Sequence, residues 1–342
     1  MLVLAVLASS AVLAPAAGAN VRCSGDPSKV ERLDLTVAGQ PAWGLYAVPA
    51  NAPRGLVVFF HGYSHTAHSW AAHVARTAQE EGVIAVAMDY RGQVDLPPEP
   101  GSTLPRSRGW QVSEGAEDSV AAAQLFDRTC TLPTIVAYGV SMGGNASGLA
   151  VASRASRADG APLFDQWFDI EGAVNVIEIY SAARALAANA TADIEREMGG
   201  TLEERPEAYT TRTVVRRADD IKASGIKGVT IVHGVDDGLV PNSQSREMQS
   251  RLRTLGIPTD VITAGTRGPT SEPGTTLSGS LVPGFDSPFA GHADEASTTH
   301  IVGKTGFERL SAYLRDGETP QCRDYVVDGT TQTMTQVPGA GC

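Results

Sequence analysis

A serine in the pattern Gly-x-Ser-x-Gly is the residue of this chain with the clearest chemical potential. The pattern spans Gly139-Val140-Ser141-Met142-Gly143 and follows an apolar, strand-like run that ends at Tyr138. Between a strand and a helix, it forms a sharp turn that holds the serine Oγ clear of the backbone. The glycines are required because any side chain there collides with the neighbouring strand or helix. Ser141 is therefore the predicted nucleophile.

A serine hydroxyl is a weak nucleophile at neutral pH, so it needs partners. A histidine must accept its proton, and an acid must orient that histidine and stabilise its charged form. When the serine follows a strand of a parallel sheet, the three residues occur in the order serine, acid, histidine. The chain after Ser141 contains residues in that order.

The acid comes after a predicted strand at residues 229–232. Residues 233–241 read His-Gly-Val-Asp-Asp-Gly-Leu-Val-Pro. Together with the serine motif, this segment makes the chain resemble the α/β-hydrolase superfamily, whose loop at this place often reads H-G-x-x-D-x-x-V-P. The resemblance extends over roughly residues 30–315 and implies Asp237 as the acid of a Ser-His-Asp triad. Asp236 remains the alternative, and both aspartates are also suited to the turn before the next helix.

Two histidines follow the acid, His292 and His300. The resemblance favours His292 as the catalytic base, because the family's histidine often follows a glycine in a loop after the last strand. His300 is the alternative base, and its structural interpretation is a residue at the start of the closing helix.

The negative oxygen of a tetrahedral intermediate needs preorganised backbone N–H donors. The residue after the nucleophile, Met142, is expected to supply one amide. The other is expected from His61-Gly62-Tyr63, which matches the family's oxyanion loop, with the Tyr63 amide favoured over that of Ser64. Polyester-degrading cutinases of this superfamily likewise pair an aromatic residue in this loop with a methionine after the serine, which hints at polyester substrates.

Strand-like and helix-like segments alternate over most of the chain, which predicts the α/β class with a mainly parallel sheet covered on both faces by helices. The resemblance implies the α/β-hydrolase fold, with residues 20–342 as one domain. Strands are expected at residues 56–60, 83–88, 132–138, 167–174, 229–232 and, as the last, 259–264. Helices are expected at residues 70–81, 113–128, 145–154, 243–255 and 301–314.

Three segments stand apart from this alternation. Residues 175–220 are rich in helix formers and charge, and they are predicted to form a lid inserted between two strands. Residues 94–106 contain too many prolines and glycines for regular structure. Residues 265–291 form a long loop of Gly, Thr, Ser and Pro, a kind of loop that is usually functional or mobile.

The first nineteen residues are uncharged and apolar, and they end in Ala17-Gly18-Ala19, which predicts a signal peptide at residues 1–19. The alternative is an N-terminal membrane anchor, but the apolar run is shorter than the roughly 20 residues of a membrane span, so no stable membrane span is expected. An even number of cysteines in an exported chain predicts two disulfides. Of the three possible pairings, we favour one that clamps the polar tail, residues 316–342, and one that ties the mature N-terminus to the loop before the serine strand: Cys322 with Cys342, and Cys23 with Cys130.

A net charge of −11 argues against nucleic acid as a partner. The cluster of His61, His65, His68 and His73 invites a metal site, but no carboxylate accompanies it, so no metal and no cofactor is expected. The prediction is a secreted serine esterase that acts on a small-molecule, lipid or polymer ester. The alternatives are a serine peptidase resembling prolyl oligopeptidases and a non-catalytic binding protein on a hydrolase scaffold.

Overall fold

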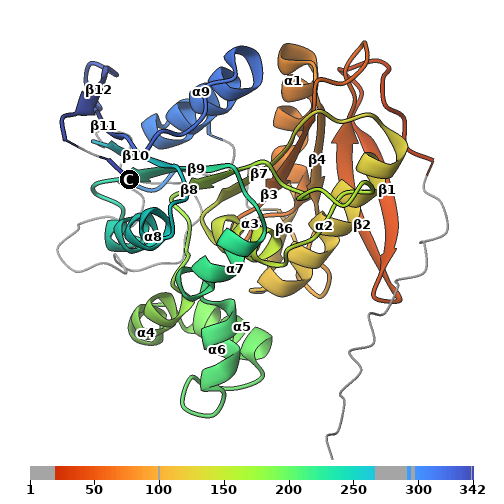
Figure 1. Cartoon of the computed structure of the whole chain (residues 1–342). Helices are drawn as coiled ribbons and strands as arrows, with labels where there is room; N and C mark the ends of the chain where they lie inside the picture. Colours follow the sequence, from red (N-terminus) through yellow and green to blue (C-terminus); the bar gives the residue numbers. More distant parts are fainter. Residues whose placement is uncertain (1–19, 99–100, 266–290, 294–296, 340) are drawn as a thin grey trace, which may run out of the picture.

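A ten-stranded sheet organises the computed structural model, which describes residues 20–98, 101–265, 291–293, 297–339 and 341–342. The strand order is β1-β2-β4-β3-β7-β8-β9-β10-β11-β12. The pairs from β4 to β11 are parallel, whereas β1–β2, β2–β4 and β11–β12 are antiparallel (Figure 1). The carboxyl ends of the parallel strands therefore share one edge, which is where ligands bind in open α/β sheets.

The strands of this sheet are β1 Glu31–Val37, β2 Gln40–Ala47, β3 Leu56–Phe60, β4 Ile84–Met88, β7 Ile135–Val140, β8 Gln166–Ile170, β9 Gly228–Gly234, β10 Thr259–Ala264, β11 Asp324–Val327 and β12 Met334–Val337. The α-helices are α1 Ala71–Glu81, α2 Val112–Thr129, α3 Met142–Ala152, α4 Val176–Leu186, α5 Ala188–Met198, α6 Pro206–Arg212, α7 Ala218–Ala223, α8 Asn242–Thr254 and α9 Ile301–Asp316, with 3₁₀-helices η1 Ala67–Trp70 and η2 Val214–Arg217.

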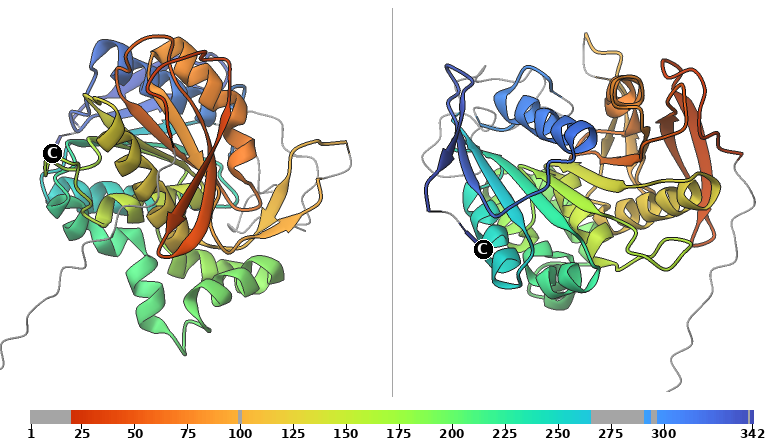
Figure 2. Two further views of the ribbon diagram at one scale, coloured as in Figure 1. Left: turned by 90° about the vertical axis from the view of Figure 1, so that its right-hand side faces the viewer. Right: turned by 45° about the horizontal axis from the view of Figure 1, so that its top comes forward.

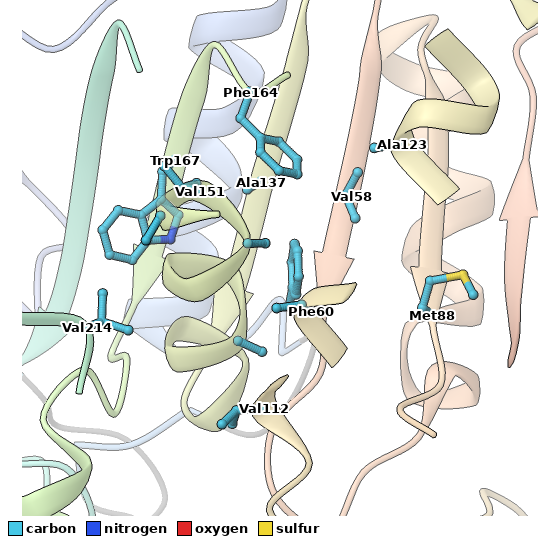
Figure 3. Packing of buried hydrophobic residues seen from close by; sticks show 14 of the residues in the cluster. Val58, Phe60, Met88, Val112, Ala123, Ala137, Val151, Phe164, Trp167 and Val214 are labelled. Atoms are coloured by element: carbon cyan, nitrogen blue, oxygen red, sulfur yellow. The ribbon is translucent and has the colours of Figure 1, made fainter. Parts of the chain in front are cut away.

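Successive residues of a strand point to opposite faces of the sheet. Both faces of the buried strands are apolar, and helices cover both of them. In β3, Val58 and Phe60 belong to the core under α2, α3 and α8, whereas Val57 and Phe59 belong to the core under α1 and α9. Figure 2 shows the two layers, and Figure 3 shows how side chains of β3, β7 and β8 pack beside α3. All five residues of β3 are buried, as expected for a central parallel strand.

The predicted fold class, a mainly parallel sheet between helical layers, is confirmed. Central strands and helices lie where their apolar patterns predicted them, usually within a few residues. The strand expected at 259–264 has those bounds, and the closing helix predicted from residue 301 begins at Ile301.

Two expectations are wrong, one about residues 94–106 and one about which strand is the last. Residues 94–106 were expected to lack regular structure, but β5 Val94–Leu96 and β6 Arg106–Arg108 form an antiparallel pair, which lies apart from the main sheet in Figure 2. Residues 259–264 are not the last strand, since β11 pairs in parallel with β10 and carries β12. Strands of three and four residues carry too little periodicity to be read from sequence, and their pairing partners are distant.

The insertion after β8 is helical, as its composition predicted. Helices α4, α5, α6 and α7 lie between β8 and β9 in the chain, and α4, α5 and α6 project from one side of the sheet (Figure 1). Their role as a lid stays a prediction. The predicted signal peptide, residues 1–19, and nearly all of the predicted long loop, residues 266–290, lie outside the described residues.

Both favoured disulfides are present. Cys23 pairs with Cys130 at a Cα–Cα distance of 5.6 Å, and Cys322 pairs with Cys342 at 5.2 Å. Disulfides persist in oxidising compartments. In the part of the chain that the structure describes, no helix has both the length and the apolar composition of a membrane span.

We predict that replacing Cys23 and Cys130 by serine lowers the free energy of unfolding by about 2–4 kcal/mol, because this disulfide closes a long loop of the unfolded chain. The two cysteines are 107 residues apart, against 20 for Cys322 and Cys342. Urea unfolding of both double-serine variants measures the effect, and the longer loop is expected to give the larger loss. Equal or reversed losses would contradict this loop-length explanation.

Candidate active site

Ser141 lies between β7 and α3 in a strained conformation. Its φ of 55° and ψ of −122° are unusual for a residue with a side chain and cost on the order of 1–3 kcal/mol. The neighbouring strand end holds it in place from both sides. Its N–H donates to the carbonyl of Ile170 at 3.0 Å, and its carbonyl accepts from the N–H of Ala173 at 3.0 Å. These bonds fix the turn rigidly at the carboxyl edge of the sheet.

The two glycines around the serine are required by close approach of the backbone. A Cβ on Gly143 would lie closer than 3.0 Å to the carbonyl oxygens of Phe60 and His61. A Cβ on Gly139 would come equally close to the carbonyl of Gly143. The structure thus shows the collisions that the Gly-x-Ser-x-Gly pattern predicts. It also places the start of α3 directly against the end of β3.

Asp237 lies in the loop after β9 and is buried. Its Oδ1 accepts the amides of Leu239 and Val240, both at 2.8 Å, and its Oδ2 lies 2.7 Å from Nδ1 of His292. His233 Nε2 is 3.2 Å from the same Oδ2. Burial opposes ionisation of this carboxyl, but His292 and the hydrogen bonds from His233 and His292 outweigh it and hold the pKa of Asp237 well below its ordinary value.

His292 lies at the same edge and is buried, with 5% of the residue exposed. Because the Asp237 carboxylate can only accept, Nδ1 of His292 carries the proton between them. In the neutral ring, Nε2 is then the proton acceptor. A Cβ on the preceding Gly291 would lie closer than 3.0 Å to the backbone of Asp236 and Asp237. The His292 backbone is thereby packed onto the loop that carries Asp237.

His300, the alternative base, is the N-cap of α9. Its Nδ1 accepts the N–H of Val302 at 3.3 Å, and its own N–H donates to Ser297 Oγ at 3.0 Å. This is the helix-start role considered in the sequence analysis. Asp236, the alternative acid, contributes backbone atoms to the packing against Gly291.

The loop after β3 lies against α3, as the contact between Phe60 and Gly143 shows. Met142 is the first residue of α3, and the first amides of a helix lack partners within the helix. Ser64 adopts a φ of 68°, and its carbonyl accepts the N–H of Ser107 at 3.3 Å. The assignment of the Met142 and Tyr63 amides to an oxyanion site stays a prediction.

The Tyr63 side chain joins this loop to the helical insertion. Its hydroxyl donates to Asp193 Oδ2 of α5 at 2.7 Å. Burial and the Asp193 carboxylate together raise the pKa of Tyr63 well above its ordinary value. Arg108 of β6 and Arg196 of α5 also bind the buried Asp193 carboxylate. The insertion and the β5–β6 pair therefore meet beside the predicted oxyanion loop.

The four histidines considered as a metal cluster contact aromatic rings and a hydroxyl group. His61 is buried and stacks on Tyr90 with ring centroids 3.8 Å apart, and burial lowers the pKa of His61 to about 3. His65 Nδ1 lies 3.1 Å from Ser69 Oγ. His68 lies 5.3 Å from the ring of Trp43, and His73 stacks on Phe307 at 4.3 Å.

Sequence reasoning missed two acids at the end of β8, Asp169 and Glu171. Glu171 lies close to the proposed acid and base. Among the described residues, Glu171, Asp237 and His292 form a group whose side-chain N and O atoms lie within 4.8 Å of one another. An acid directly after a strand next to the serine strand was the available signal, because Glu171 follows β8 as Asp237 follows β9. Asp169 carried no such signal, since it lies inside the strand.

Asp169 lies beneath the serine turn. It pairs in register with Gly139 of β7, and a Cβ on Gly144 of α3 or on Gly172 would come closer than 3.0 Å to its Oδ1. Its carboxyl is fully buried, and neither oxygen has a hydrogen-bond partner among the described residues. Burial raises the pKa of Asp169 to about 7, against a smaller opposing influence of His233.

The alpha/beta hydrolase family profile matches residues 57–270, whereas a comparison with curated proteins finds no match. An esterase of Pyrobaculum calidifontis superposes with a TM-score of 0.56 at 16% identity, over 84% of this chain and 85% of that one.

Two further solved structures are longer proteins. The acylaminoacyl peptidase of Pyrococcus horikoshii superposes with a TM-score of 0.51 at 16% identity, over 70% of this chain and 37% of that one. A puromycin hydrolase superposes with a TM-score of 0.51 at 17% identity, over 69% of this chain and 35% of that one. This chain thus spans about a third of their length. At such identities, all three likenesses concern the fold.

The free energy of unfolding is expected to fall between pH 5 and pH 8, and we predict that this fall is smaller in Asp169→Asn than in the wild type. The carboxyl has a pKa of about 7 in the folded protein and roughly 3.9 in the unfolded chain. Between these values the folded state holds a proton that the unfolded state has released, so stability falls as pH rises. Removing the carboxyl is expected to reduce this fall by about 2–3 kcal/mol.

Urea unfolding of the wild type and the variant at both pH values measures the difference. Asp159→Asn is the matched control, because Asp159 is exposed and its one described side-chain hydrogen bond, to the Ala161 amide, suits an asparagine as well. An unchanged pH dependence in Asp169→Asn would show that the buried carboxyl is not the titrating group.

Proposed function

The chain belongs to the α/β hydrolase family, and we propose that it is a secreted serine hydrolase that cleaves carboxylic esters through an acyl-enzyme intermediate. One observation supports the proposal most strongly. His292 Nδ1 lies 2.7 Å from Asp237 Oδ2 at the sheet edge where Ser141 occupies its left-handed turn. An imidazole that is buried, oriented by a carboxylate and placed in this family's histidine position is suited to general-base catalysis.

In the proposed reaction, Ser141 Oγ attacks the ester carbonyl carbon while His292 Nε2 takes the hydroxyl proton. The carbonyl electron pair moves onto the oxygen, which the Met142 and Tyr63 amides stabilise. The oxyanion then collapses, the bond to the alcohol breaks, and His292 returns its proton to the leaving oxygen. Water then attacks the acyl carbon while the same histidine takes its proton. The bond from that carbon to Ser141 Oγ breaks, His292 returns the proton to Oγ, and the acid leaves. Asp237 stays ionised and stabilises the imidazolium.

Secretion forms part of the proposal. Residues 1–19 have the composition of a signal peptide, and the disulfides Cys23–Cys130 and Cys322–Cys342 suit an oxidising compartment. We further propose that residues 20–342 act as one hydrolase domain. In it, the insertion at 175–220 covers the site as a lid, and the tail at 316–342 is clamped by the second disulfide.

An ester is the preferred substrate class, and a peptide is the second candidate. The Pyrobaculum esterase superposes over 85% of its length, whereas this chain spans about a third of the acylaminoacyl peptidase. The likeness to that peptidase nevertheless makes a prolyl-oligopeptidase-like serine peptidase worth a direct comparison. Both candidates use the same serine and histidine, so substrate preference separates them.

We predict that Ser141→Ala and His292→Ala each reduce kcat for p-nitrophenyl esters by roughly 10³-fold or more, because each removes a group that acts on the reacting atoms. His300→Ala is the matched control and is expected to retain most activity, since His300 caps α9. Turnover of an ester series from acetate to palmitate, beside a proline p-nitroanilide, measures both rate and preference.

Each outcome decides between named alternatives. Loss of activity in His300→Ala with retention in His292→Ala would overturn the proposed base. Turnover of the anilide alone would make the protein a peptidase. Folded wild type that turns over neither substrate and does not react at Ser141 with a fluorophosphonate would point to a binding protein on a hydrolase scaffold.

A further inference from the structure

Glu171 reaches the site from a strand that the proposed triad does not use. It follows β8, which lies between the serine strand β7 and the acid strand β9. Its φ is 45°, and its N–H donates to the carbonyl of Val232 in β9 at 2.7 Å. The left-handed turn ends β8 while its backbone stays attached to β9. A non-glycine residue held in this strained region is a common mark of a functional position.

The Glu171 carboxyl group makes two contacts with the His292 segment. Oε1 accepts the N–H of Ala293 at 2.8 Å, so it anchors the backbone that carries the histidine. Oε2 lies 3.9 Å from Nδ1 of His292, the atom that Asp237 binds at 2.7 Å. Glu171 and Asp237 are 0% and 1% exposed, so water screens neither carboxyl from the imidazole.

We propose that Glu171 is a positioning residue for His292, fixing its backbone through Ala293 and adding a second carboxylate beside Nδ1. This inference rests on the proposed function, because it assigns Glu171 a part in the same reaction. During proton transfer the ring becomes positively charged beside two buried carboxylates. Two nearby carboxylates then stabilise the imidazolium more than Asp237 alone.

The charged groups around His292 determine in which direction the Glu171 substitution should shift the pH dependence. Asp237 faces His292 from the loop after β9, where the backbone of Asp236 packs against Gly291. His233 contacts Asp237 from within β9, and Glu171 approaches from the end of β8. Asp169, also on β8, interacts with His233. Among these groups, Asp237 and Glu171 have carboxylate oxygens within 4 Å of His292 Nδ1. Removing the Glu171 charge should therefore make the imidazole easier to deprotonate.

Glu171→Gln separates charge from anchoring, because the amide oxygen can still accept the Ala293 N–H. We expect the acidic limb of the kcat/KM profile to move to lower pH by about 0.5–1 unit, since a nearby negative charge raises the pKa of a histidine. At the alkaline plateau, kcat is expected to fall severalfold. Glu171→Ala removes the anchor as well and should lower kcat further than Glu171→Gln.

Glu81→Gln is the matched control. Glu81 is also a buried carboxyl, 4% exposed, but it ends α1 and binds Ser311 and Arg315 of α9. Its replacement should leave the acidic limb in place even if it lowers stability. A wild-type profile in Glu171→Gln, with normal kcat, would overturn the proposal.

A second comparison tests whether the two carboxylates act on the same ring. In an Asp237→Asn background, Glu171→Gln is expected to cost at least tenfold in residual kcat/KM, more than it costs in the wild type, because neighbouring groups couple. Equal costs in the two backgrounds would contradict a shared role.

Ser141→Ala distinguishes failure of the proposed function from failure of this inference. If Ser141→Ala retains full activity, the proposed function fails, whereas a dead Ser141→Ala with no effect at Glu171 refutes only this inference.

Discussion

The close approach of α3 to the ends of the parallel strands is the constraint on which the rest of the structure depends. Gly143 lies against the carbonyls of Phe60 and His61, and Gly144 lies against Gly172. Ser141 is left in a strained turn that its neighbours fix through both backbone polar groups. Because strain persists only where the surroundings over-determine it, the conformation of Ser141 depends on the ends of β3, β7 and β8 together.

This edge of the sheet concentrates buried acids, and each is accommodated differently. Asp237 receives backbone amides and two histidine contacts, so it remains charged. Glu171 accepts one backbone N–H. Asp169 has no hydrogen-bond partner among the described residues and retains a proton into the neutral range. Carboxyls of the same type thus serve as anion, anchor or neutral acid according to the donors around them.

The sequence predicted the elements near the site better than those at the sheet margins. The central parallel strands and the amphipathic helices carry enough pattern to be recognised, as β10 and α9 show, whereas β1 and β2 were not predicted. The short strands β5, β6, β11 and β12 do not carry enough pattern, since their pairing depends on distant partners. In the site, Ser141 was predicted from its motif, and Asp237 and His292 were predicted from their order after the serine together with the family resemblance. Glu171 could have been suspected only from its place after a strand.

By itself, the sequence determined the fold class, the nature of the predicted nucleophile and the number of cysteines. These follow from local patterns, namely the Gly-x-Ser-x-Gly turn, alternating apolar segments and composition. Only the tertiary structure decided which histidine contacts Asp237, which cysteines pair, and that Glu171 and Asp169 lie beside the same edge. Those facts depend on distances between residues far apart in the chain, and a sheet sets such distances through its strand order, which composition and spacing do not specify.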